Sequence, residues 1–209
     1  MKTTYKALVQ HVLLKWNEKR RSASSTAAVH PRLIIALAGP PGSGKTTIAR
    51  RVVSDLNASS EPRPKSVVVE ATFDGPGVVR LVRQLRASAG LRPVRAPTFD
   101  HELGDPVPCG LTVEADVDVC VVEGNYLLTD EEPWGRIAPL VDDRWLVRVE
   151  PMLARDRVAA RHVAAVNEDT MEKALLRAES NDMVNGKYIA RRSEGRYDLL
   201  IDSIEELST

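Results

Sequence analysis

Residues 39–46 read Gly-Pro-Pro-Gly-Ser-Gly-Lys-Thr, a stretch that matches every fixed position of the G-x-x-x-x-G-K-[ST] pattern. It follows the apolar run 33–38, which has the length of a buried strand, and it precedes residues 47–53, which favour a helix. Strand, glycine-rich loop and helix in this order form the context in which the pattern binds phosphate. The alternative is a glycine-rich turn that binds nothing, and the complete pattern in its proper context disfavours it.

Each part of this loop has a physical task. Its glycines allow backbone conformations that a side chain forbids, so the loop amides and the following helix N-terminus can point at one anion. Lys45 is expected to reach the β- and γ-phosphates of ATP, and the Thr46 hydroxyl is expected to bind Mg²⁺. The residues expected to bind the nucleotide are Gly39, Pro40, Pro41, Gly42, Ser43, Gly44, Lys45, Thr46 and Thr47.

The amino-acid composition excludes several classes of protein. The chain has 209 residues, of which 43% are hydrophobic and 28% charged, and this suits one globular domain. Its formal net charge is zero, so it lacks the broad basic field of a nucleic-acid-binding protein. No apolar run approaches the ~20 residues that cross a bilayer, so no membrane association is expected. Cys109 and Cys120 have neither redox nor zinc spacing, which is typical of free thiols in a reducing, cytoplasmic compartment.

The N-terminal stretch has two interpretations. Apolar residues recur at helical spacing over residues 4–19, which predicts an amphipathic helix. Residues 19–26 are basic, serine-rich and poor in acids, a composition that mitochondrial transit peptides share. A helix packed on the domain edge, followed by a polar connector, is the favoured interpretation. We therefore expect a single domain over 1–209, with the helix and connector in 1–30 and a nucleotide-binding core in 31–209.

The rest of the chain alternates strands with helices. Short β-rich runs occur at 67–69, 117–122, 145–149 and 197–201, and helical spacing occurs at 76–88, 152–166 and 170–183. Residues 54–65 form a polar connector, and the proline-rich segment 93–108 is expected to be irregular. This alternation predicts an α/β protein with the P-loop NTPase fold: three α/β/α layers around a mostly parallel, five-stranded sheet.

Two further sets of side chains suit phosphate chemistry. Glu123 ends a buried strand, where open α/β sheets bind ligands, and there it would either hold Mg²⁺ or cap the following turn. Arg157 and Arg161 are four residues apart on one helix face. They form either a lid that stabilises transferred phosphoryl charge or a solvated helix surface. We expect Lys45, Glu123, Arg157 and Arg161 to be the catalytic residues, and Thr46 and Glu123 to be the metal ligands.

The segment 96–106 also concentrates polar groups. Asp100 and His101 are expected to hydrogen-bond the hydroxyls of an acceptor, because irregular segments can aim polar side chains into a site. The alternative is a turn-rich crossover in which Asp100 turns the chain.

Together these motifs resemble the phosphoribulokinase/uridine kinase family of P-loop kinases, above all its nucleoside- and pantothenate-kinase-like members. The matching segments are 39–47, 96–107, 121–128, 154–162 and 181–186; they run in family order within residues 32–202. The resemblance implies ATP- and Mg²⁺-dependent phosphorylation of a hydroxyl on a small metabolite of the nucleoside, pantothenate or sugar class. It also implies that Arg157 and Arg161 belong to the lid, and that the protein is a monomer or homodimer.

One family motif is missing. Such kinases carry an aspartate in a D-G-F-H motif after the second strand, and that aspartate orients or deprotonates the attacking hydroxyl. Here residues 67–69 run through 70–75 directly into the next helix, and Asp74 looks like the entry to that helix while remaining a candidate acceptor ligand. The alternative function is therefore a nucleotide-binding protein of kinase descent whose transferase activity is impaired by loss of the acceptor loop.

Overall fold

The computed structural model describes residues 5–23, 30–59, 62–100, 105–165 and 168–204. Its elements in chain order are α1 (Tyr5–Ala23), β1 (Leu33–Ala38), α2 (Lys45–Asn57), β2 (Ser66–Glu70), α3 (Gly75–Ala87), β3 (Val94–Asp100), β4 (Asp105–Val113), β5 (Val119–Gly124), the 3-10 turns η1 (Trp134–Arg136) and η2 (Ala138–Leu140), β6 (Asp143–Val149), α4 (Pro151–Ala164), α5 (Met171–Arg177), the π turn η3 (Ala178–Asp182), α6 (Met183–Ser193) and β7 (Leu199–Ser203).

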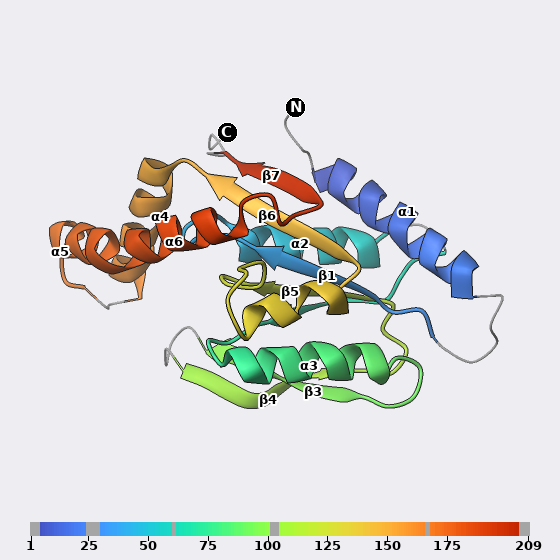
Figure 1. Cartoon of the computed structure of the whole chain (residues 1–209). Coiled ribbons are helices and arrows are strands. Elements are labelled where there is room, and N and C mark those ends of the chain that lie inside the picture. Colours follow the sequence, from blue (N-terminus) through green and yellow to red (C-terminus); the bar gives the residue numbers. More distant parts are fainter. Residues whose placement is uncertain (1–4, 24–29, 60–61, 101–104, 166–167, 205–209) are drawn as a thin grey trace.

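Five parallel strands form the central sheet in the order β2-β5-β1-β6-β7 (Figure 1). The middle strand β1 is buried along its whole length, so each of its side chains belongs to a hydrophobic core. Alternate residues enter different cores because successive strand side chains point to opposite faces. One core takes Leu33, Ile35 and Leu37, and the other takes Ile34, Ala36 and Ala38. The predicted three-layer P-loop NTPase fold with a five-stranded sheet is confirmed.

Helices cover both faces of this sheet. Helices α1 and α2 lie on one face, while α3 and the η1–η2 segment lie on the other (Figure 1). The predicted helix over 4–19 begins at Tyr5 and continues to Ala23, farther than the spacing indicated. It buries Leu8, Val12 and Trp16 in the core, so this helix packs on the domain edge, as the favoured interpretation expected.

A buried carboxylate fixes α1 to the sheet. Asp143 opens β6 with no exposed surface, and its Oδ2 atom lies 2.6 Å from His11 Nε2 of α1. The same oxygen accepts a hydrogen bond of 2.8 Å from Trp145 Nε1, and Lys15 lies 3.6 Å from the other oxygen. A buried charge is tolerated when it is paired and hydrogen-bonded in this way.

The segment expected to be irregular is instead a β-hairpin. Strands β3 and β4 pair antiparallel as a separate two-stranded sheet, and β3 packs against α3 and β2 (Figure 1). The expectation for 93–108 was wrong because prolines were taken as strand breakers. In a two-stranded ribbon each strand has an unpaired edge, so a residue without an N–H group is tolerated, and the register shifts at Pro97.

Two helix ends also differ from the sequence-based boundaries. Helix α2 continues to Asn57, into the segment expected to be a connector. The helix expected over 170–183 starts after Thr170, which caps its first turn, and continues through η3 and α6 to Ser193. Gly186, which lies inside α6, did not stop the helix; a Cβ there would meet Pro40 of the glycine-rich loop at 3.3 Å.

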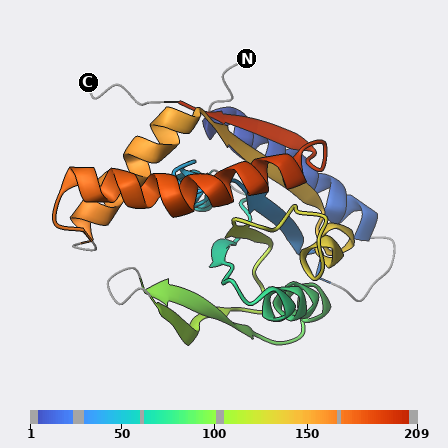
Figure 2. The same cartoon turned by 60° about the vertical axis from the view of Figure 1, so that its left-hand side comes forward.

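The three C-terminal helices lie beyond the carboxyl ends of the strands (Figure 2). Those ends meet at one edge, where Glu70 pairs in register with Glu123, and Ala38 with Gly124. Helix α4 starts after Glu150, whose side chain accepts a 2.8 Å hydrogen bond from the Leu153 amide. This edge is where open parallel sheets bind ligands.

Both cysteines are free thiols, as expected: Cys109 is exposed and Cys120 is buried in β5. Burial raises the pKa of the Cys120 thiol to about 12. Within the described ranges, no helix is long and apolar enough to cross a membrane.

Candidate functional site

The glycine-rich loop closes tightly over the start of α2. Gly42 and Gly44 have φ angles of +75° and +81°, a region that L-residues with side chains rarely adopt. A Cβ on Gly42 would also lie 2.4 Å from the Ala154 carbonyl oxygen of α4. Gly44 occupies the N-cap of α2 without a side-chain cap, so the first-turn amides remain available for an anion. The local structure could therefore hold a phosphate, and the loop with the start of α2 is called the cradle below.

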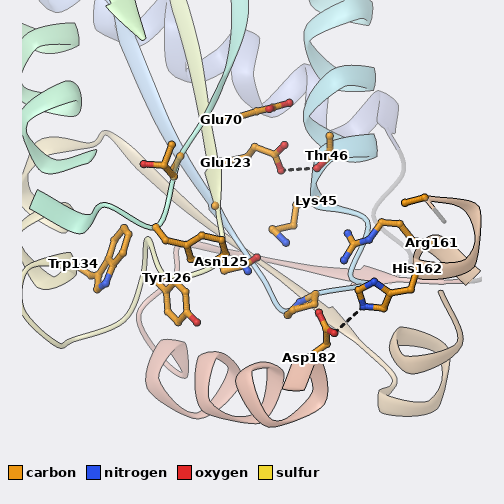
Figure 3. A pocket seen from close by; sticks show the side chains of 16 residues that line it. Lys45, Thr46, Glu70, Glu123, Asn125, Tyr126, Trp134, Arg161, His162 and Asp182 are labelled. Atoms are coloured by element: carbon orange, nitrogen blue, oxygen red, sulfur yellow. Dashed lines mark hydrogen bonds and ion pairs between the residues drawn. The ribbon is translucent and has the colours of Figure 1, made fainter. Parts of the chain in front are cut away.

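Thr46 and Glu123 form an oxygen pair beside this cradle. Thr46 Oγ1 donates a 3.0 Å hydrogen bond to Glu123 Oε2, and Glu123 is only 5% exposed at the end of β5 (Figure 3). Burial raises the pKa of Glu123, while the Thr46 hydrogen bond and the Lys45 charge oppose that rise. The part of the chain that the structure describes contains no group of three or more His, Cys, Asp or Glu side chains that could hold a metal ion. Hydroxyl and carboxylate oxygens fit Mg²⁺, which takes its remaining ligands from phosphates and water.

Lys45 extends into the space between Glu123 and Arg161 (Figure 3). Among the described residues, its ammonium has one hydrogen-bond acceptor, the Pro40 carbonyl oxygen at a long 3.4 Å. Desolvation by burial lowers the pKa of Lys45, the charge of Glu123 raises it and the charge of Arg161 lowers it, and together they bring this pKa to about 8. The free protein thus holds a cation that lacks strong partners, as expected for a group that meets phosphate.

This pKa predicts that ATP affinity depends on pH. Bound phosphates favour the charged form of Lys45, whereas the free protein loses this proton as the pH rises through about 8. Binding above pH 8 must then take up a proton, so affinity should fall by up to about ten-fold for each further pH unit. Calorimetry at pH 7.5 and 9.5, in two buffers of different ionisation enthalpy, measures both effects. Equal affinities at the two pH values in the wild type would contradict the assignment, and the Lys45→Met variant should show no such dependence.

Two cavities meet at the cradle. The smaller, about 330 Å³, lies over the loop and the start of α2, between Gly42, Gly44 and the side chains of α4. The larger, about 420 Å³, lies along the carboxyl edge of the sheet. Lys45, Thr46 and Arg161 line both cavities. A phosphoryl group held by these three residues would face a donor on one side and an acceptor on the other.

The two predicted lid arginines occupy different places. Arg161 lines both cavities, as a lid residue should. Arg157 lines only the smaller one, and its guanidinium donates to Gly42 O at 3.3 Å, to Ser203 Oγ at 2.8 Å and to Ile204 O at 2.8 Å. Arg157 therefore links the loop to the end of β7, while the Arg161 side chain is directed to the site.

One of the predicted acceptor ligands, Asp74, lies away from the larger cavity. Asp74 caps α3, where its carboxylate accepts a 3.0 Å hydrogen bond from the Gly77 amide, and it is not among the residues that line the cavity. Asp100 ends β3, and His101 lies outside the described residues. Their roles stay predictions.

Spacing in the sequence did not reveal the side chains that do line the larger cavity. Tyr126 and Trp134 have ring centroids 5.6 Å apart, and Phe73, 72% exposed, meets Tyr126 at 6.1 Å. On the opposite side of the cavity, His162 and Asp182 are hydrogen-bonded (Figure 3). These residues come from different elements, and Tyr126, His162 and Asp182 lie in the motif segments quoted above, so the motifs were their only signal.

Comparison with characterised sequences gives kinase relatives. A Schizosaccharomyces pombe protein named as a candidate uridine kinase is 32% identical over 186 residues, which cover 77% of this chain and 79% of that protein. An ATP-dependent kinase-like protein of Aspergillus versicolor is 36% identical over 141 residues, covering 66% of this chain and 82% of the relative. No family model matches the sequence.

Solved structures share the fold. A Silicibacter protein described as a candidate fructose transport system kinase superposes with a TM-score of 0.77 at 25% identity, covering 94% of this chain and 98% of that chain. YFH7 of Saccharomyces cerevisiae, described as a candidate P-loop kinase with a circular permutation, superposes with a TM-score of 0.80 at 15% identity, covering 96% and 99%. The second likeness concerns the fold alone.

Proposed function

Since the chain belongs to the uridine kinase-like family of P-loop kinases, we propose that it is an ATP-dependent kinase that transfers the γ-phosphoryl group to a hydroxyl of a small metabolite. The acceptor is proposed to be of the nucleoside, pantothenate or sugar class. The names of the two sequence relatives support kinase chemistry and ATP use, and the description of the Silicibacter neighbour as a fructose transport system kinase is a reason to include sugars among the acceptor classes.

The meeting of the two cavities at Lys45, Thr46 and Arg161 carries this proposal. Phosphoryl transfer requires donor and acceptor in line on opposite sides of one phosphorus atom. The smaller cavity adjoins the phosphate cradle and would take the nucleotide. The larger one, with its aromatic and polar sides, has the size of a small-molecule site and would take the acceptor.

Each residue in this scheme has a defined task. The loop amides and Lys45 would hold the β- and γ-phosphates, and Thr46 with Glu123 would hold Mg²⁺, which offsets charge on the phosphate oxygens when bound. Arg161 would stabilise the charge that spreads over the equatorial oxygens in the loose transition state. Arg157 would keep the loop in place through its hydrogen bond to Gly42.

A nucleotide-binding protein with impaired transfer is the second candidate. One observation favours it: only residues 71–74 separate the end of β2 at Glu70 from the start of α3 at Gly75. This leaves no room for the acceptor loop of the related kinases. Such a protein would bind ATP and release ADP slowly whether or not an acceptor is present.

Acceptor screening separates the two candidates. Purified protein with Mg²⁺ and ATP is given uridine, cytidine, pantothenate or fructose, and ADP release is followed with a coupled assay. We expect one of these classes to raise ADP release by about 10²-fold or more over the rate with water, because a positioned acceptor reacts far faster than one that is not held. Slow release that no acceptor stimulates would favour the second candidate.

A further inference from the structure

The larger cavity contains a histidine–carboxylate pair to which neither spacing nor resemblance gave a role. His162 of α4 and Asp182 of η3 line the cavity together, with Nε2 and Oδ2 3.1 Å apart (Figure 3). Their side chains are 12% and 13% exposed. An ionised carboxylate can only accept, so with Asp182 ionised this pairing favours the tautomer that has its proton on Nε2. In the neutral ring Nδ1 then keeps its lone pair and can act as a base.

Packing between α4 and the following helical segment brings these two side chains together. Helix α4 buries Val158 and Ala159 against Ala174 and Ala178 of the next helical segment. The π turn η3 interrupts that segment between Ala178 and Asp182, at the residue that meets His162. Single π turns within helices are frequent at functional sites.

The position of the pair places it on the acceptor side. Lys45, Thr46 and Arg161 line both cavities, whereas His162 and Asp182 line only the larger one. Because Arg161 and His162 both line the larger cavity, His162 lies on the side of the proposed phosphoryl position where the acceptor would lie.

The two other carboxylates that line this cavity are engaged elsewhere. Glu123 accepts from Thr46 at 3.0 Å, and Glu70 accepts from Arg50 at 3.0 Å. The segment between β2 and α3 contributes Ala71, Thr72 and Phe73 to the lining, none of which can accept a proton at neutral pH. His162 is the lining residue that has a carboxylate partner at one ring nitrogen and a second ring nitrogen, Nδ1, that can receive a proton in the neutral ring.

We propose that His162, oriented by Asp182, is the catalytic base that receives the proton of the acceptor hydroxyl; this rests on the proposed kinase function. As the acceptor oxygen bonds to the γ-phosphorus, its proton moves to Nδ1 and the bond from the γ-phosphorus to the β,γ-bridging oxygen breaks. ADP takes up the electron pair of that bond. The imidazolium, stabilised by the Asp182 carboxylate, then returns its proton to solvent. A base positioned in this way contributes about 10²–10⁴-fold to rate.

The test compares two glutamine variants. In His162→Gln the side-chain amide can still donate to Asp182 but cannot take a proton, so the link between α4 and η3 is kept. His30→Gln is the matched control, because His30 is also partly buried beside a carboxylate, Asp118 at 3.4 Å, and lies outside both cavities. ADP release is measured with uridine, cytidine, pantothenate and fructose, and with water as the acceptor.

We expect His162→Gln to lower kcat by about 10²-fold with every probe that the wild type uses. The KM for ATP and the melting temperature should stay at wild-type values, and His30→Gln should be fully active. Added imidazole should restore part of the activity of His162→Gly, since a free base can occupy the vacated space.

Each other result overturns the assignment. Activity of His162→Gln within three-fold of wild type would show that no base is lost. A loss that comes with weaker ATP binding or a lower melting temperature, and that imidazole does not rescue, would make the pair a link between helices only. If the wild type is active and His162→Gln is equally active, the base assignment is rejected and the proposed kinase function stands. A wild type inactive with every probe removes the proposed function and this inference with it.

Discussion

Replacing Lys45 with methionine is expected to lower ATP-dependent turnover by about 10²–10³-fold, or ~3–4 kcal/mol, the usual effect of removing one preorganised donor from a developing negative charge. The ammonium lies where the two cavities meet, and within the described part of the chain its one hydrogen-bond acceptor is the Pro40 carbonyl, at 3.4 Å. Steady-state kinetics and calorimetric titration with ATP would measure the loss in turnover and in affinity.

Stability should move in the opposite direction in this variant. Burial lowers the pKa of Lys45, so its charged form costs folding free energy at pH 7, and a methionine of similar length removes that cost. The melting temperature of the free protein should therefore be unchanged or higher. Lys65→Ala is the control: Lys65 is an exposed partner of Asp116, and such pairs contribute little. Equal turnover and ATP affinity in wild type and Lys45→Met would refute the phosphate role of the loop.

Glu123→Gln is expected to reduce turnover by about 10²-fold and to raise the Mg²⁺ concentration that gives half-maximal activity. The amide keeps the shape of the side chain and its hydrogen bond with Thr46 but lacks the negative charge that attracts the metal. Magnesium titration of ADP release at fixed ATP measures this. The loss of about 10²-fold is on the order of the effect of a single electrostatic group at a reacting phosphate.

The melting temperature provides a second, independent readout for Glu123→Gln, because Glu123 is buried. Desolvation raises the pKa of Glu123, so the ionised carboxylate destabilises the free fold at pH 7 and the neutral amide should not lower the melting temperature. An unchanged magnesium titration, together with a lower melting temperature, would return Glu123 to a structural role at the end of β5.

Sequence-based prediction was most accurate for segments whose local residue pattern directly reflects their position in the fold. The run 33–38 is apolar at every residue because β1 is buried on both faces, so its bounds could be read without knowledge of its neighbours. The loop after it needs glycine at two positive-φ positions, and this requirement shows directly in the sequence. The hairpin β3–β4 went unrecognised because proline disfavours strands in general, and tolerance of proline depends on an unpaired edge that no local pattern reveals.

The acceptor side was harder to predict, because its residues converge from distant elements. Trp134 follows β5, His162 lies in α4 and Asp182 in a π turn, and no short spacing links them. Helical spacing placed Arg157 and Arg161 on one face, which is correct for their helix but could not show that Arg157 is held by Gly42 and Ser203. Asp74 and the glycine after it match the first two positions of the missing D-G-F-H motif, yet the Asp74 carboxylate caps a helix.

The central claim is that phosphate moves from ATP bound at the loop to a hydroxyl in the larger cavity. The most direct measurement is the fate of the label when γ-labelled ATP and Mg²⁺ are incubated with the protein and an equimolar mixture of uridine, cytidine, pantothenate and fructose. We predict that wild-type protein places the label on one of these organic acceptors and that Lys45→Met does not. Label that appears only as inorganic phosphate, or that remains on ATP, would contradict the account.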